Sequence, residues 1–174
     1  MASLSVVVTF VIGQAPTMIS GVPGANYIFT VMYAILTSFS LLIYEGRRWS
    51  FFIQTTVFTL LIIPTHFGGT AFDPTSKLHF MVTSFFIDVL FNSFYAGFKK
   101  INKLRIWAVL GAVTFWSMNP LWGIIIKSTF FYPPDYISTL VHVVLVLFPV
   151  IVIEAIVGGW IGYKTFNRIK NINS

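Results

Sequence analysis

Four polar side chains recur at helical spacing within one apolar segment, residues 80–98. At intervals of four, four and three residues come Ser84, Asp88, Asn92 and Tyr95. Residues three and four apart share one face of an α-helix. An ionisable group at the centre of a membrane-spanning helix costs about 2.5–3.5 kcal/mol on insertion scales, so it should face a protein interior or a wet cavity. The stripe therefore predicts either a ligand contact or a protonated carboxyl bonded to a neighbouring helix.

A second group of side chains suits a small-molecule site. The segment 106–126 contains Trp116, Asn119, Pro120 and Trp122. Because proline removes a backbone donor and frees a carbonyl, the sequence predicts either a non-helical, ligand-lining stretch here or a simple kink. Tryptophan faces attract cations, and Asp88 would supply the opposite charge. An aromatic, cationic or amine-bearing ligand would suit this group.

Three histidines and a carboxylate lie close to the ends of apolar segments: His66, His79, His142 and Asp73. Such side chains can ligate copper, zinc or the iron of a haem. No pair of them has the i,i+4 spacing that places two ligands on one helix face. We therefore predict no metal site and no cofactor, and we keep metal binding by the histidines only as an alternative. His142, one turn inside its predicted span, joins the predicted ligand-binding group.

Two glycines near the C-terminus predict a close helix contact. Gly158 and Gly162 are four residues apart, and Glu154, a second carboxylate within an apolar segment, precedes them by one turn. Small residues at this spacing let two helices approach closely. The pair therefore predicts a packing seam, either inside the protein or against a partner chain.

The composition sets the kind of element that positions these residues. The chain has 174 residues, of which 56% are hydrophobic and 9% charged, and its mean hydropathy is +0.84. Soluble domains carry about 25% charged residues, so a soluble enzyme, a nucleic-acid-binding domain and a disordered tail are excluded. Cysteine is absent, which excludes disulfides, thiolate metal sites and cysteine nucleophiles. We expect a multi-pass protein of the lipid bilayer.

Six apolar stretches predict an all-α protein with one transmembrane domain over residues 1–174, a bundle of six transmembrane helices. A helical span needs about 20 apolar residues, and the stretches lack the alternation of a β-barrel. The expected spans are about 3–17, 26–44, 51–65, 80–98, 106–126 and 137–163.

The basic residues are divided unequally between the two sides of this arrangement. Nine follow the second, fourth and sixth spans: Arg47, Arg48, Lys99, Lys100, Lys103, Arg105, Lys164, Arg168 and Lys170. The other side has only Lys77 and Lys127. Cytoplasmic loops carry the excess of Lys and Arg, so both termini are predicted to be cytoplasmic, in the cell membrane. The net charge of +6 thus reflects topology, and no nucleic-acid partner is expected.

Four segments carry a resemblance to a known family. They are the turn Gly21-Val22-Pro23-Gly24, the stretch Glu45-Gly46-Arg47-Arg48, residues 86–91 around Asp88, and the ending from Glu154 to Tyr163. With its six short spans, the whole chain resembles the substrate-binding (S) component of an energy-coupling factor transporter, and spans three to five are similar to the thiamine-precursor branch. The resemblance implies capture of a vitamin or cofactor precursor from outside. It also implies two kinds of partner, a transmembrane coupling subunit and cytoplasmic ATPases.

We therefore predict a substrate-capture component of a transporter that binds a small, vitamin-like or cofactor-precursor solute. The predicted ligand-binding residues are Asp88, Asn92, Trp116, Asn119, Trp122 and His142. The alternative is an accessory subunit of a larger membrane complex, structural or metal-binding. An enzyme is not expected, because the sequence lacks a convergent set of acid, base and nucleophile and any nucleotide-binding motif.

Overall fold

The computed structural model describes residues 1–130 and 132–172, and it is 82% helical. Within these residues no β-strand occurs, so the predicted all-α class is confirmed. The α-helices are α1 (Ala2–Val8), α2 (Ala15–Ser20), α3 (Thr30–Tyr44), α4 (Ser50–Leu61), α5 (Leu78–Lys100), α6 (Leu104–Thr129) and α7 (Pro134–Ile172). A π-helix, η1 (Thr9–Gly13), and two 3-10 helices, η2 (Ala25–Phe29) and η3 (Thr75–Lys77), join them.

Five helical stretches of the described chain are long and apolar enough to cross a membrane. They are Ala2–Ser20, Ala25–Tyr44, Thr75–Lys100, Leu104–Thr129 and Pro134–Ile172. The remaining apolar helix, α4, has 12 residues. At 1.5 Å per residue it is about 18 Å long, against roughly 30 Å for a bilayer core. The segment predicted as the third span, residues 51–65, is therefore a shorter helix than expected.

Two expectations about the helices are corrected by the structure. Helix α6 runs without interruption through Pro120, so of the two alternatives predicted at this position, the non-helical stretch does not form. A proline costs one backbone hydrogen bond, and the buried side chains of Trp116 and Asn119 hold the helix just before it. Helix α7 continues to Ile172, beyond its predicted end at residue 163. Just past the predicted end, the Lys164 ammonium lies 3.9 Å from the centre of the Trp160 ring, one turn earlier in the same helix.

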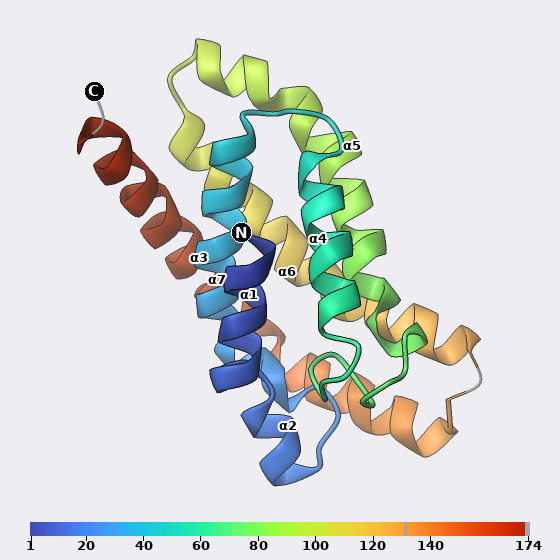
Figure 1. Ribbon diagram of the computed structural model, residues 1–174. Helices are drawn as coiled ribbons and strands as arrows, with labels where there is room; N and C mark the ends of the chain where they lie inside the picture. Colours follow the sequence, from blue (N-terminus) through green and yellow to red (C-terminus); the bar gives the residue numbers. More distant parts are fainter. Residues whose placement is uncertain (131, 173–174) are drawn as a thin grey trace.

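The helices form one bundle in which α7 packs against both α3 and α6 (Figure 1). Helix α6 also contacts α5, and α5 contacts α4. We call the end that carries residues 45–49, residues 101–103 and the last turns of α7 the basic end. The opposite end carries the turn 21–24 and the segment 62–74, and we call it the loop end (Figure 1). The two ends thus separate the nine basic residues from Lys77 and Lys127.

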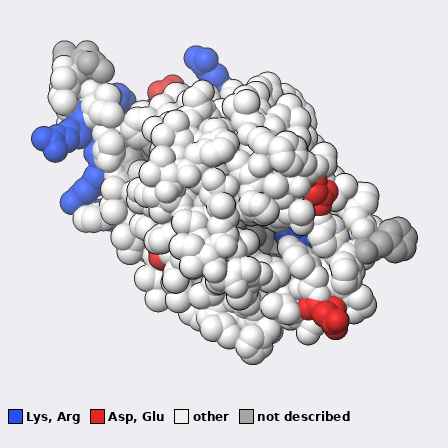
Figure 2. All heavy atoms as spheres, turned by 60° about the horizontal axis from the view of Figure 1, so that its bottom comes forward, with Lys and Arg blue, Asp and Glu red and all other residues white. Residues whose placement is uncertain are grey.

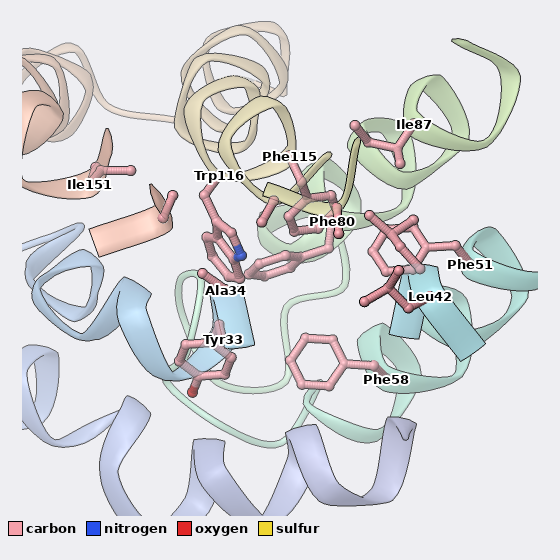
Figure 3. Packing of buried hydrophobic residues seen from close by; sticks show 14 of the residues in the cluster. Tyr33, Ala34, Leu42, Phe51, Phe58, Phe80, Ile87, Phe115, Trp116 and Ile151 are labelled. Carbon is pink, nitrogen blue, oxygen red and sulfur yellow. The ribbon is translucent and has the colours of Figure 1, made fainter. Parts of the chain in front are cut away.

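An aromatic core lies between the helices (Figure 3), and Phe67 connects the segment 62–74 to it. Phe67, only 3% exposed, stacks on Phe80 of α5 with ring centres 5.5 Å apart. On its other side the same ring lies 4.9 Å from Tyr33 of α3, which in turn contacts Trp116. Aromatic pairs at such distances add to the free energy of burial. The segment that closes the loop end is therefore held by the core.

Candidate functional site

Asp88, the central residue of the predicted polar stripe, holds the beginning of α4. Its Oδ2 accepts the backbone N–H of Phe52 at 2.6 Å, and its Oδ1 accepts the side-chain amide of Asn92. Asn92 also donates to the carbonyl of Arg47 at 3.2 Å. The first N–H groups of a helix have no partner within it, and a carboxylate also suits the positive helix end. The stripe thus fastens α4 and the preceding loop to α5 at the basic end.

The second carboxylate within an apolar helix has the same kind of partner. Glu154 of α7 accepts the backbone N–H of Val31 at 3.1 Å. Val31 lies in the first turn of α3, so this bond also satisfies an N-terminal donor. Both carboxylates that the sequence places within apolar segments therefore support the beginning of a neighbouring helix.

The six predicted ligand-binding residues are not gathered around one cavity. Asp88 lines a pocket of about 270 Å³ at the basic end together with Arg48 and Trp49. Trp116 lies in the core, where its Nε1–H donates to Thr37 Oγ1 at 3.2 Å. Asn92 bonds to Asp88, as described above.

The other three of these residues lie on α6 and α7. Trp122 stacks on Phe86 of α5 at 5.1 Å, and His142 is exposed on α7. Asn119 is completely buried and accepts a hydrogen bond from Tyr27. Their contact with a ligand stays a prediction.

The glycine pair of α7 packs inside the chain. A Cβ atom on Gly158 would lie 2.5 Å from the carbonyl oxygen of Val31, and one on Gly162 would lie 2.5 Å from that of Ile35. Both oxygens belong to α3, so only glycine permits this approach of the two backbones. Of the two arrangements that the sequence predicted, the structure thus contains the internal one.

An open cavity of about 450 Å³ lies at the loop end. Its lining comes from α2, the turn 21–24, η2, residues 66–70, α6 and α7, and includes Thr17, Met18, Asn26, Tyr27, His66, Gly68, Lys127, Tyr136 and Leu140. Figure 2 brings this end forward and shows a hollow in a mostly uncharged surface, with a basic group recessed inside it. The lysine that lines the cavity is Lys127.

Two buried lysines support the rim of this cavity. Lys127 is 5% exposed and its ammonium donates to the carbonyl of Gly68 at 2.7 Å. Lys77 is 0% exposed, and its ammonium donates to the carbonyl of Thr70 at 2.7 Å and to Ser76 Oγ at 3.2 Å. Buried ammonium groups are costly and mark functional sites in membrane proteins. In the sequence, Lys77 and Lys127 are the two basic residues that lie opposite the other nine. This isolated position could have pointed to the site.

Beneath the cavity lie polar groups without partners. Tyr27, which lines the cavity, donates its hydroxyl to Asn119 Oδ1 at 3.2 Å. A Cβ atom on Gly123 would lie 3.7 Å from two ring carbons of His79 and 3.8 Å from the Tyr27 hydroxyl, so the three groups are neighbours. In the described part of the chain, Asn119 Nδ2 is buried and has no hydrogen-bond partner, and the buried imidazole of His79 makes no hydrogen bond of good geometry, although it lies against the backbone of Ser76. Because buried polar atoms nearly always have partners, this floor has unused hydrogen-bonding capacity.

The histidines do not form a metal centre in the part of the chain that the structure describes. Over residues 1–130 and 132–172 there is no group of three or more His, Cys, Asp and Glu side chains that could hold a metal ion. His66 lines the cavity, whereas His79 lies beneath it and His142 is exposed elsewhere on α7. Within these residues, no cluster of ligands supports the metal-binding alternative.

No protein-family model, curated protein or solved structure matches this chain. The candidate site therefore rests on its own geometry: a cavity at one end of a helical bundle, a buried ammonium group in its wall and unpaired polar atoms beneath its floor.

Proposed function

We propose that the chain crosses the cell membrane six times, with both termini in the cytoplasm. The nine basic residues at the basic end support this orientation. Helix α4 provides the sixth crossing in spite of its length, because the segment 62–74 is packed into the loop end and covers the remaining depth. In this orientation the cavity opens to the outside.

The function that this arrangement supports best is capture of a small solute from outside, as the substrate-binding component of a transporter. The observation that carries the proposal is the cavity of about 450 Å³ at the end opposite the basic residues. Small-molecule sites have about this volume, with apolar and aromatic walls and a few placed polar groups. Here Tyr27, Tyr136 and Leu140 supply the walls and Lys127 the charge. The solute is a vitamin-like compound or cofactor precursor, as the family resemblance implies.

Release of the solute into the cell requires other chains. The sequence has no nucleotide-binding motif, so a transmembrane coupling subunit and cytoplasmic ATPases supply the energy. The protein itself is a binding component and no enzyme.

Native mass spectrometry of the full-length protein, purified from its own cells in detergent, tests this function. Met18 lines the cavity and is 59% exposed, so Met18→Trp narrows the cavity without a change in the core. The adjacent Ile19 is 86% exposed and lies outside the lining, which makes Ile19→Trp the matched control. We expect a bound small molecule on the wild type and on Ile19→Trp, and its loss on Met18→Trp. Equal retention on all three proteins, or stable polypeptide partners without any small molecule, would contradict the proposal and favour an accessory subunit.

A further inference from the structure

We infer that the captured solute carries an anionic group, a carboxylate or a phosphate, and that the ammonium group of Lys127 binds it inside the cavity. This inference rests on the proposed function and adds the chemical class of the solute. It differs from the cationic ligand that the sequence suggested around Asp88. That carboxylate is engaged by a backbone N–H and by Asn92 at the basic end.

The first support is the unused donor capacity of Lys127. An ammonium group has three N–H donors. Within the described residues, one of them goes to the carbonyl of Gly68. The group also lies 5.9 Å from the centre of the Tyr136 ring, which is within the range of a cation–π contact. Lys127 is thus held in place at the cavity wall and keeps donors for a ligand.

The second support is the charge balance around the cavity. The three hydrogen bonds that Lys77 and Lys127 make in the described part of the chain all go to neutral oxygens. The nearest acidic residue of the loop end, Asp73, attracts both ammonium groups. Its Oδ1, however, accepts two hydrogen bonds from Thr75, and its Oδ2 accepts the hydroxyl of Tyr132. One carboxylate therefore faces two buried cations that repel each other, and an anion in the cavity would relieve the remaining positive charge.

The third support is the shape of the remaining lining. Tyr27 and Tyr136 present rings and Leu140 an aliphatic side chain to the cavity. Such walls accommodate a flat or aliphatic body, while Lys127 fixes the charged end. A bilayer also contains anionic headgroups, so the anion can belong to a free solute or to a lipid, and the experiment has to separate the two.

The test compares three probes of matched shape: 2-naphthoate, 2-naphthamide and 2-naphthylmethylamine. Each is titrated by calorimetry into the full-length protein in phosphatidylcholine nanodiscs, with empty nanodiscs as the blank. We expect the wild type to bind naphthoate at least ten times more tightly than the amide, and the amine most weakly. In Lys127→Gln the preference for naphthoate over the amide should fall below about twofold. Glutamine removes the charge and retains an N–H donor, on a side chain one bond shorter than that of lysine.

Lys77→Gln separates direct contact with the ligand from the general positive charge of this end, because it removes a buried charge from a residue outside the cavity lining. We expect this variant to keep a preference of at least fivefold. A second titration, into nanodiscs that contain phosphatidylglycerol, tells a lipid headgroup from a free solute. If naphthoate binds at least five times more weakly there than in phosphatidylcholine nanodiscs, the anion belongs to a lipid headgroup. If its affinity is unchanged, the anion belongs to a free solute.

The inference is overturned if the wild type binds the three probes equally, prefers the amine or does not bind naphthoate, and also if Lys127→Gln keeps the full preference. Its failure can be told apart from failure of the proposed function. A bound solute that Met18→Trp removes, together with no preference for the anionic probe, leaves solute capture intact and refutes only the anionic class.

Discussion

The polar groups around Asp88 and those around Lys127 both place a charge inside an apolar bundle, yet they are satisfied in different ways. Both oxygens of Asp88 are engaged by groups of the chain, a helix N-terminal N–H and the amide of Asn92. Lys127 keeps unused donors beside a cavity of about 450 Å³. A charged side chain inside an apolar helix bundle is therefore not a sufficient sign of a binding site. The informative combination is a buried charge with spare hydrogen-bonding capacity next to open volume.

The largest effect on stability is expected at the contact of α7 with α3, which, like the groups around Asp88, holds helices of the bundle together. Gly158→Leu would push a side chain against the backbone of Val31, where there is no flexible neighbour to move. We expect the free energy of unfolding to fall by about 3 kcal/mol or more, measured as a lower melting temperature and less monodisperse protein in detergent. Gly97→Leu is the control, since nothing lies within 4 Å of a Cβ atom there. If both variants were equally stable, the glycine face would be free for a partner chain.

Asp88→Leu should have the next largest effect. It leaves the Phe52 N–H and the Asn92 amide without their acceptor in a buried place, which costs about 2–3 kcal/mol. Asp88→Asn keeps one acceptor oxygen and should cost less. The melting temperature measures the loss, and native mass spectrometry of the folded fraction should show undiminished solute. If Asp88→Leu lost its solute at an unchanged melting temperature, Asp88 would be a ligand contact. The regions around Asp88 and Lys127 would then no longer differ in this respect.

Glu154→Leu should destabilise the protein less than Asp88→Leu does. Glu154 accepts the backbone N–H of Val31, lies against the backbone of Thr30 in the same N-terminal turn of α3, and is only half-buried. Loss of such a capping bond costs about 1 kcal/mol. Chemical denaturation in mixed micelles would measure both variants side by side. The opposite order of stabilities would mean that the carboxylate in α7 has partners beyond Thr30 and Val31.

The smallest loss of stability is expected at the cavity floor. His79→Phe gives up at most the weak contact of the imidazole with the backbone of Ser76 and keeps a flat ring beside Phe80, so the free energy of unfolding should change by less than about 1 kcal/mol. Asn119→Leu should cost more, because the Tyr27 hydroxyl loses its acceptor. Thermal unfolding of both variants checks this order. A large loss at His79 would show that an ordered water or another unseen partner satisfies the imidazole.

Much of the fold follows from local sequence properties. Low charge and long apolar runs predicted an all-α protein with helices fit for a membrane, and the structure confirms these features. The length of α4 was not predictable from hydropathy, because the apolar residues 62 and 63 continue past its end at Leu61. The continuity of α6 through Pro120 depends on packing that a single segment does not reveal.

The candidate site was harder to predict from the sequence than the fold, because its residues are far apart along the chain. The polar stripe was visible, but the partner of Asp88 lies 36 positions away in a helix start that hydropathy does not mark. The cavity lining comes from turns and helix ends, and residues such as Gly68 and Tyr136 carry no motif. The sequence did mark the turn 21–24, His66 and the two isolated lysines Lys77 and Lys127, but nothing in it showed that the turn, His66 and Lys127 line one cavity.

An electron cryo-microscopy structure of the full-length protein, purified from its own cells into nanodiscs, tests the central claim most directly. The account predicts density for a small molecule in the cavity between Tyr27 and Tyr136, with one end about 3 Å from the Lys127 ammonium. Density for a solute beside Asp88 and Trp49 at the basic end, with the cavity of the loop end filled by protein side chains, would contradict it.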